Sequence, residues 1–174
     1  MVIIASVLAV IALILVTFIL LTLFMLIFDL LLELPYVGTN RKKIETIMKF
    51  AQLKKGQTVV DLGSGDGRLL IASAQQGAFA IGYEINPIFI FLSKFKSKAR
   101  GVSDHIKIYQ QSLWKADLKV ADVIFVYALR KSMKKFEDFI YKNAQPDTRI
   151  IVNTNPFPNR KPIKFENGIY LYIV

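Results

Sequence analysis

The first 28 residues carry no charged side chain, and this uncharged run divides the chain into an apolar N-terminal segment and a polar remainder. Val, Ile, Leu and Phe dominate the run, and only Ser6, Thr17 and Thr22 interrupt it weakly. As a helix such a run would reach about 42 Å, which exceeds the roughly 30 Å hydrocarbon core of a bilayer. It therefore predicts one transmembrane helix over residues 1–32, which leaves about 140 residues for a single folded domain.

A cleaved signal peptide is the competing interpretation of this run. It would need a basic start, a shorter apolar stretch and a small-x-small cleavage site, and none of these precedes the boundary at residues 29–35. No lysine or arginine lies before the apolar run, whereas Arg41, Lys42 and Lys43 follow it closely. The positive-inside rule therefore predicts a single-pass protein whose folded domain faces the cytoplasm.

Basic residues exceed acidic ones by 23 to 13, for a formal charge of +10. This excess serves solubility, and it would also attract the anionic headgroups of a lipid bilayer. We expect no nucleic acid partner because the sequence carries no dedicated motif for one. The chain has no cysteine, which excludes disulfides, thiolate metal sites and a cysteine nucleophile. The sequence carries no signal for an oligomeric state.

Residues 33–56 are predicted to hold a linker and a first helix. The linker, Leu34–Asn40, is too short to let the domain drift far from the bilayer. Thr39 or Asn40 would cap the helix, which we expect to end near Lys54 and Gly56.

Residues 57–174 alternate between β-branched strands and helical patterns, and this alternation predicts an α/β fold. Strands are expected over 58–62, 78–84, 105–109, 122–127 and 148–152. The order predicts a parallel sheet with right-handed crossovers and a ligand at the carboxyl ends of the strands. Asn167-Gly168 predicts a closing antiparallel hairpin, and the proline-rich stretch before it leaves no room for the usual crossover helix. The fold is therefore a minimal one.

Helices are expected between these strands over 68–76, from Pro87 to about Gly101, and from Ser132 onward with Ser132 as the cap. In the second of these helices Asn86 and Pro87 supply the N-cap and the first turn. Its apolar side chains form one stripe at helical spacing: Ile88, Phe91, Leu92, Phe95 and Ala99.

A glycine cluster follows the first strand and carries the chemistry of the chain: Asp61-Leu62-Gly63-Ser64-Gly65-Asp66-Gly67-Arg68. The glycines allow a sharp turn from strand to helix and a close approach to a ligand. A dinucleotide fingerprint would need glycine where Arg68 stands, and a phosphate-binding P-loop would need a following Gly-Lys-Ser/Thr. The remaining pattern, Asp-x-Gly-x-Gly-x-Gly, resembles the first motif of class I methyltransferases, whose cofactor is S-adenosylmethionine. The resemblance implies that the loop holds the methionine part and that Asp61 lies near its amino group.

Glu84 strengthens this interpretation because it ends the second strand, where a carboxylate can accept both ribose hydroxyls. The alternative is a solvated charge beside a tight turn. After the third strand, Ser112 is a candidate contact to the adenine, or else a plain loop residue. The predicted cofactor-binding residues are Asp61, Gly63, Ser64, Gly65, Gly67, Glu84, Asn86 and Ser112, and no metal is expected.

Several further segments narrow the resemblance: Pro35-Tyr36-Val37-x-Thr39, Gly82-Tyr83-Glu84-Ile85-Asn86-Pro87, Leu113-Trp114-Lys115 and Pro156-Phe157-Pro158. Together with the glycine loop they are similar to the membrane-anchored lysine methyltransferases that modify the ATP synthase c subunit and the adenine nucleotide translocase in mitochondria. The resemblance implies a lysine of a membrane protein as the methyl acceptor, a need for residues 35–39 in activity, and the mitochondrial inner membrane as the location in a eukaryote. This chain departs from the family at Ser112, at Thr154-Asn155 and over residues 127–130.

Tyr127, at the end of strand four, and Asn155, after strand five, are the candidate catalytic residues because each could orient an amine at the rim of the site. Two other functions stay open. One is methylation of a lipid or small lipophilic substrate, and the other is a non-catalytic module that binds the cofactor. His105 and Trp114 are expected only to pack or to lie exposed.

Overall fold

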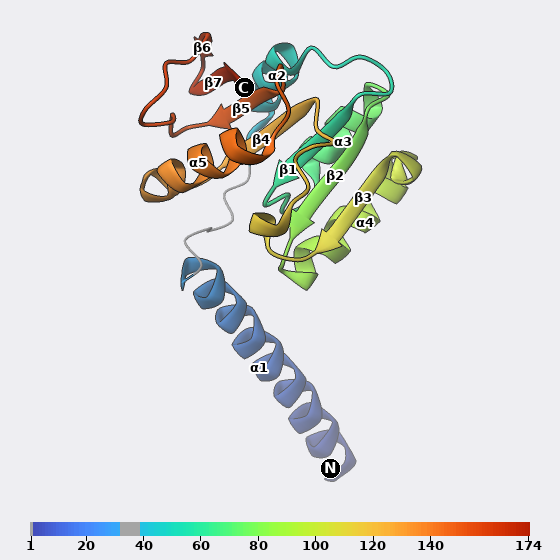
Figure 1. Ribbon diagram of the computed structural model, residues 1–174. Coiled ribbons are helices and arrows are strands. Elements are labelled where there is room, and N and C mark those ends of the chain that lie inside the picture. Colours follow the sequence, from blue (N-terminus) through green and yellow to red (C-terminus); the bar gives the residue numbers. More distant parts are fainter. Residues whose placement is uncertain (1, 32–38) are drawn as a thin grey trace. The chain divides into compact units, whose positions relative to one another are not determined.

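The computed structural model describes residues 2–31 and 39–174, in two compact units that are considered separately (Figure 1). The first unit is helix α1, Val2–Leu31. Among the described residues, Ile4–Phe24 is the one helical stretch long and apolar enough to cross a membrane. Its large side chains, such as Leu13 and Phe18, are exposed. The predicted linker residues 34–38 lie outside the described part of the chain.

The second unit is built on a seven-stranded sheet of order β3-β2-β1-β4-β5-β7-β6. Its strands are β1 Thr58–Leu62, β2 Phe79–Glu84, β3 Ile106–Gln110, β4 Val123–Tyr127, β5 Arg149–Asn153, β6 Lys164–Glu166 and β7 Ile169–Ile173. Strands β1 to β5 are parallel, and β7 runs antiparallel to both of its neighbours. The predicted Rossmann-like sheet with a terminal antiparallel hairpin is therefore confirmed.

Four helices connect or precede these strands: α2 Arg41–Ala51, α3 Arg68–Gln75, α4 Pro87–Ala99 and α5 Met133–Asn143. Three single turns of 3-10 helix add to them: η1 Ser103–His105, η2 Leu113–Lys115 and η3 Arg130–Ser132. The path β1-α3-β2-α4-β3 crosses the sheet in one direction, whereas β4-α5-β5 crosses it in the other. Right-handed crossovers therefore place α3 and α4 on one face of the sheet and α5 on the opposite face (Figure 1).

Helix α2 belongs to the core of this unit although it precedes the glycine loop. Ile47, Phe50 and Ala51 are buried and form one cluster with strand residues that include Val59 and Phe125. The side chain of Asn40 accepts a hydrogen bond from the Lys43 amide, which confirms Asn40 as the N-cap. The helix ends earlier than predicted because Gln52 turns left-handed, with φ 44°, and returns its N–H to the Met48 carbonyl.

The stretch between β5 and β6 contains no crossover helix, as predicted. Phe157 attaches this stretch to the domain. Its side chain is buried, and its ring packs against the Tyr172 ring with the centroids 4.8 Å apart. The Phe157 amide also donates to the Tyr172 hydroxyl at 3.1 Å. On the other side of the stretch, the buried Glu137 of α5 lies 3.6 Å from the Arg160 guanidinium. These contacts hold the stretch against the domain in place of a crossover helix.

Ser132 at the N-cap position of α5 and the apolar stripe of α4 are both present, but neither makes the contacts that such features usually make. Ser132 stands at the N-cap position of α5 but makes no capping hydrogen bond through its side chain, because its backbone is already helical. In α4 the apolar stripe does not face the core, since Phe91 and Phe95 are 69% and 66% exposed while Ser93 is fully buried. A small residue is needed at position 93 because α4 comes close to the glycine loop there: a Cβ added at Gly67 would overlap the Ser93 side chain.

His105 and Trp114 have packing roles, as expected. The His105 ring lies 5.3 Å from the Phe79 ring, and Trp114 packs against Phe136 and Phe139 of α5.

We predict that Gly82→Val destabilises the domain although valine is favoured in strands. A Cβ at Gly82 would lie 2.5 Å from Ser64 Oγ and 2.7 Å from Leu70 Cδ1, so overpacking should lower the free energy of unfolding by about 1–3 kcal/mol. Urea unfolding measures this, and Lys107→Val on the exposed side of β3 is the matched control, expected to change stability by less than about 0.5 kcal/mol. Equal stability of both variants would refute the packing account.

Candidate active site

The glycine loop joins β1 to α3, and all three of its motif glycines have left-handed backbone angles: Gly63 (φ 91°), Gly65 (52°) and Gly67 (77°). Its amides are used within the protein. The amides of Gly63 and Ser64 donate to the Tyr83 carbonyl at 3.0 and 3.2 Å, and the Gly65 amide donates to the Glu84 carboxylate at 2.9 Å. Because these N–H groups already have acceptors, the loop does not present them to a phosphate. This agrees with the sequence-based rejection of dinucleotide and P-loop sites.

Glu84 links three backbone segments at the carboxyl edge of the sheet. One carboxylate oxygen accepts the Gly65 amide, and the other accepts the amides of Ile85 and Asn86, both at 2.8 Å. Carboxylates that accept several backbone N–H groups are held in one orientation. Glu84 is half-buried, so it is fixed in place and still reachable from the rim of the site.

Asp61 lies at the end of β1 with only 6% of its surface exposed. Burial raises the pKa of its carboxyl to about 7, and repulsion from Glu84 and Asp66 adds to the rise. A buried carboxylate in this situation is stabilised by any cation that enters the site. An ammonium group is the kind of ligand that this environment favours.

Asp66 has the opposite electrostatic behaviour although it belongs to the same loop. Burial favours its neutral form, but hydrogen bonds from Arg68 and Lys96 outweigh this and hold the pKa of Asp66 well below its usual range. Arg68 also donates to the Thr39 carbonyl at 2.6 Å. The loop is thereby tied to α4 through Lys96 and to the segment before α2 through Thr39.

A polar cluster that sequence reasoning missed lies at the carboxyl end of β5. The ammonium group of Lys43 donates to Asn153 Oδ1 at 3.0 Å and to Thr154 Oγ1 at 2.8 Å. Asn153 is 3% exposed, and its amide lies 3.4 Å from Thr39 Oγ1. The sequence feature that could have indicated this cluster is Asn153, a polar residue that directly follows the apolar run Ile150-Ile151-Val152. The cluster joins α2 to the edge of the sheet where the loop lies.

The two candidate catalytic residues lie near each other at this edge. Tyr127 ends β4 and is paired in register with Asn153. Asn155 is half-buried, and its Nδ2 donates to the Ala128 carbonyl at 2.8 Å, which fixes the amide group. The geometry thus places both residues beside the carboxyl ends of β4 and β5. Their catalytic role stays a prediction.

The other predicted cofactor residues have defined local roles. Asn86 is buried and caps α4 by accepting the Ile88 amide at 3.0 Å. Ser64 turns its hydroxyl toward Gly82, where it has no hydrogen-bond partner within the described part of the chain. Ser112 follows β3 at the start of η2 and makes no capping bond through its side chain. Contacts of these residues to a cofactor stay predictions.

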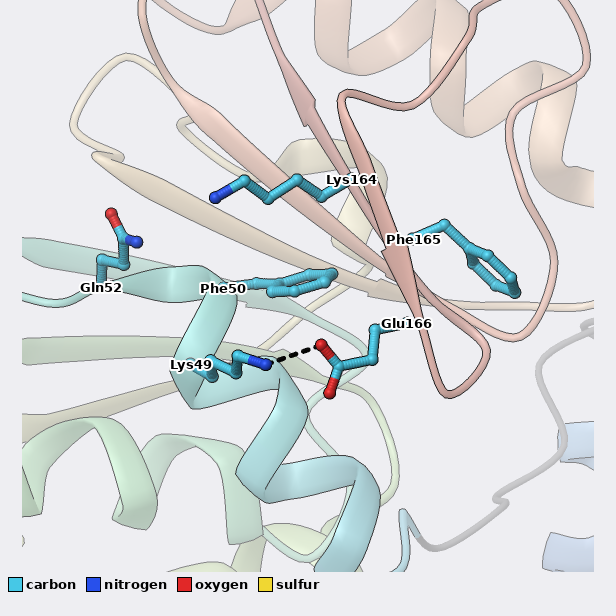
Figure 2. A pocket seen from close by; sticks show the side chains of 6 residues that line it. All are labelled: Lys49, Phe50, Gln52, Lys164, Phe165 and Glu166. Atoms are coloured by element: carbon cyan, nitrogen blue, oxygen red, sulfur yellow. Dashed lines mark hydrogen bonds and ion pairs between the residues drawn. The ribbon is translucent and has the colours of Figure 1, made fainter.

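A pocket of about 370 Å³ lies elsewhere, between the end of α2 and strand β6 (Figure 2). It is lined by Lys49, Phe50, Gln52, Lys164, Phe165 and Glu166. An ion pair of 2.7 Å joins Lys49 to Glu166 at its side. Because β6 forms the opposite edge of the sheet from β3, this pocket contains none of the predicted site residues.

The residues at the strand ends fit the chemistry of S-adenosylmethionine. Asp61 could hold its amino group, and Glu84 could accept from its ribose hydroxyls. A Cβ added at Gly63 would meet only Leu113, at 3.9 Å, so the loop backbone is open to close approach by a ligand on that side. Fold and site together define a class I methyltransferase domain that depends on S-adenosylmethionine.

Comparison with known proteins then gives the family. Residues 61–164 match the ANTKMT methyltransferase domain, and the chain belongs to that family. It is 33% identical over 129 residues to the human lysine N-methyltransferase named for the ATP synthase c subunit, and the match covers 74% of this chain and 55% of the human protein. The chain thus spans about half the length of that relative.

Two further proteins match over most of their own length. A protein-lysine N-methyltransferase of Saccharolobus islandicus is 27% identical over 152 residues, or 82% of this chain and 94% of that protein. The crystal structure of an RNA methyltransferase from Salinibacter ruber with S-adenosyl-L-homocysteine superposes with a TM-score of 0.75 at 26% identity. It covers 79% of this chain and 93% of that one. The family resemblance inferred from the motifs is confirmed.

We predict that the affinity for S-adenosylmethionine falls as the pH drops below about 7, because Asp61 is then protonated in the free domain. Binding of an ammonium group must release that proton, which costs up to about tenfold in affinity per pH unit. Calorimetric titrations on both sides of neutrality measure this. In Asp61→Asn the affinity should be weaker and this fall should vanish.

The same carboxyl provides an independent stability test. Its folded pKa is raised above the unfolded value of roughly 4, so ionisation lowers stability as the pH rises from there toward 7. Asp61→Asn should therefore raise the melting temperature of the free protein most above pH 7. A wild-type affinity that does not change with pH, together with an unchanged melting temperature, would rule out this role for Asp61.

Proposed function

We propose that this protein transfers a methyl group from S-adenosylmethionine to a lysine side chain of a membrane protein. The observation that carries the proposal is the combination of two features in one chain: a domain of the ANTKMT methyltransferase family and a helix, Ile4–Phe24, long and apolar enough to cross a membrane. Relatives named as lysine methyltransferases support the acceptor, and one of them matches this chain over 94% of its own length.

The chain needs to do little beyond positioning for this reaction. The cofactor supplies an activated methyl group on a sulfonium, and an amine lone pair forms the new N–C bond while the C–S bond breaks. A lysine ammonium must first lose its proton. Desolvation at the rim and the nearby positive charge of Lys43 both favour the neutral amine. Tyr127 and Asn155, at the ends of β4 and β5, orient that amine.

The membrane location follows from the sequence pattern around α1. Arg41, Lys42 and Lys43 follow the apolar helix and no basic residue precedes it, which favours the cytoplasmic side for the folded domain. If the protein is eukaryotic, the family resemblance implies that the membrane is the mitochondrial inner membrane. The acceptor lysine is then one that lies near the bilayer surface.

The acceptor is tested by incubating the full-length protein and methyl-labelled cofactor with isolated membranes, followed by acid hydrolysis of the protein fraction. Label in methyl-lysine is expected, and Asp61→Asn is the matched variant that should lower it. Label confined to the lipid extract would favour a lipophilic substrate. Label in added RNA alone would favour the activity named for the Salinibacter ruber relative, and no label with intact cofactor binding would favour a non-catalytic module. Each of these last three results would defeat the lysine proposal.

The anchor is tested separately by washing membranes with alkaline carbonate. Full-length protein should stay in the membrane pellet because transfer of about 20 apolar residues into the bilayer is strongly favourable. A variant without residues 1–32 should move to the supernatant. Release of the full-length protein would exclude a spanning helix.

A further inference from the structure

Helix α4 reverses the usual arrangement of an amphipathic helix. Its small polar residues, Ser93 and Ser97, are 0% and 3% exposed and face the domain. Its largest residues, Phe91 and Phe95, are 69% and 66% exposed. Ile88 is also exposed. It lies on the same face as the two phenylalanines, because residues three and four positions apart are neighbours on a helix surface. We call Ile88, Phe91 and Phe95 the α4 patch.

The close contact with the glycine loop explains the serines but not the phenylalanines. Small residues are required where α4 meets Gly67, whereas any polar side chain would serve on the outer face. Exposed apolar side chains that lie together on one face, rather than scattered singly, are a feature of interaction surfaces. The α4 patch is therefore a candidate interaction surface.

The charges around the patch indicate the chemistry of the partner that binds there. Helix α4 contains no aspartate or glutamate, and its outer face carries the exposed Lys94 and Lys98 at one edge of the patch. The exposed Arg100 follows at the end of the helix. Lys96 is engaged by Asp66 and is not part of this surface. Aromatic side chains flanked by lysines are typical of helices that lie in the plane of a membrane interface.

We propose that the α4 patch docks onto an anionic bilayer, with Phe91 and Phe95 at the boundary of headgroups and acyl chains and Lys94 and Lys98 among the headgroups. The formal charge of +10 complements such a surface, and each basic side chain near it strengthens binding roughly fivefold. Helix α4 begins at Pro87, three residues after Glu84, so docking holds the cofactor edge of the sheet at the membrane. The inference rests on the proposed membrane anchorage and does not depend on the identity of the methyl acceptor.

The absence of cysteine makes this proposal directly testable in the full-length chain. Phe95→Cys and Lys142→Cys each introduce one thiol for an environment-sensitive fluorophore. Lys142 is the matched control because it is exposed on α5, on the opposite face of the sheet. Both variants are reconstituted one copy per nanodisc, in phosphatidylglycerol mixed with phosphatidylcholine and in phosphatidylcholine alone. A lipid-borne nitroxide and an aqueous quencher report the depth of the label.

Quenching by the lipid nitroxide at position 95, absent at position 142 and weaker in phosphatidylcholine alone, is the expected result. Equal access of the aqueous quencher to both positions would overturn the proposal. A label shielded from water but out of reach of the lipid nitroxide would also overturn it, because residues 1–32 would then cover the patch. Protein that fails to float with the discs would defeat the anchorage itself, whereas floating protein with a water-exposed label defeats only this inference.

Discussion

Three backbone amides converge on one side chain: Glu84 accepts the amides of Gly65, Ile85 and Asn86. These bonds fasten the glycine loop after β1 to the end of β2 and to the start of α4. A hydrogen bond to a charged group contributes about 1.5–3 kcal/mol, so the carboxylate strongly constrains the shape of this edge.

Burial dominates the electrostatics of Asp61. It raises the pKa of this carboxyl to about 7, and repulsion from the nearby Glu84 adds to the rise. The pKa of Asp66 is lowered instead, because hydrogen bonds from Arg68 and Lys96 outweigh the effect of burial. Two carboxylates in the same short segment thus differ in their surroundings: Asp61 is buried without a cationic partner that lowers its pKa, whereas Asp66 ties the loop to its neighbours through Arg68 and Lys96. The proposed contact of Asp61 with the cofactor's amino group relies on this difference.

Local patterns predicted most of the fold, because strand periodicity and glycine placement act over a few residues. The parallel strands, the Asn40 and Asn86 caps and the closing hairpin are all present as expected. Local patterns did not predict features that a distant segment decides. Serines face the domain on α4 because Gly67 comes too close for large side chains there. The cluster of Lys43 with Asn153 joins residues 110 positions apart, and no local pattern records that contact.

Glu84 holds the glycine loop in place, and we propose that it also receives the ribose of the cofactor. Calorimetric titration of S-adenosylmethionine and S-adenosylhomocysteine into wild type, Glu84→Ala and the distant exposed control Asp138→Ala tests it most directly. Loss of a charged hydrogen-bond partner should weaken both ligands about ten- to a hundredfold in Glu84→Ala and leave Asp138→Ala unchanged. Unchanged affinity in Glu84→Ala, or tighter binding of NAD than of S-adenosylmethionine by the wild type, would contradict the account.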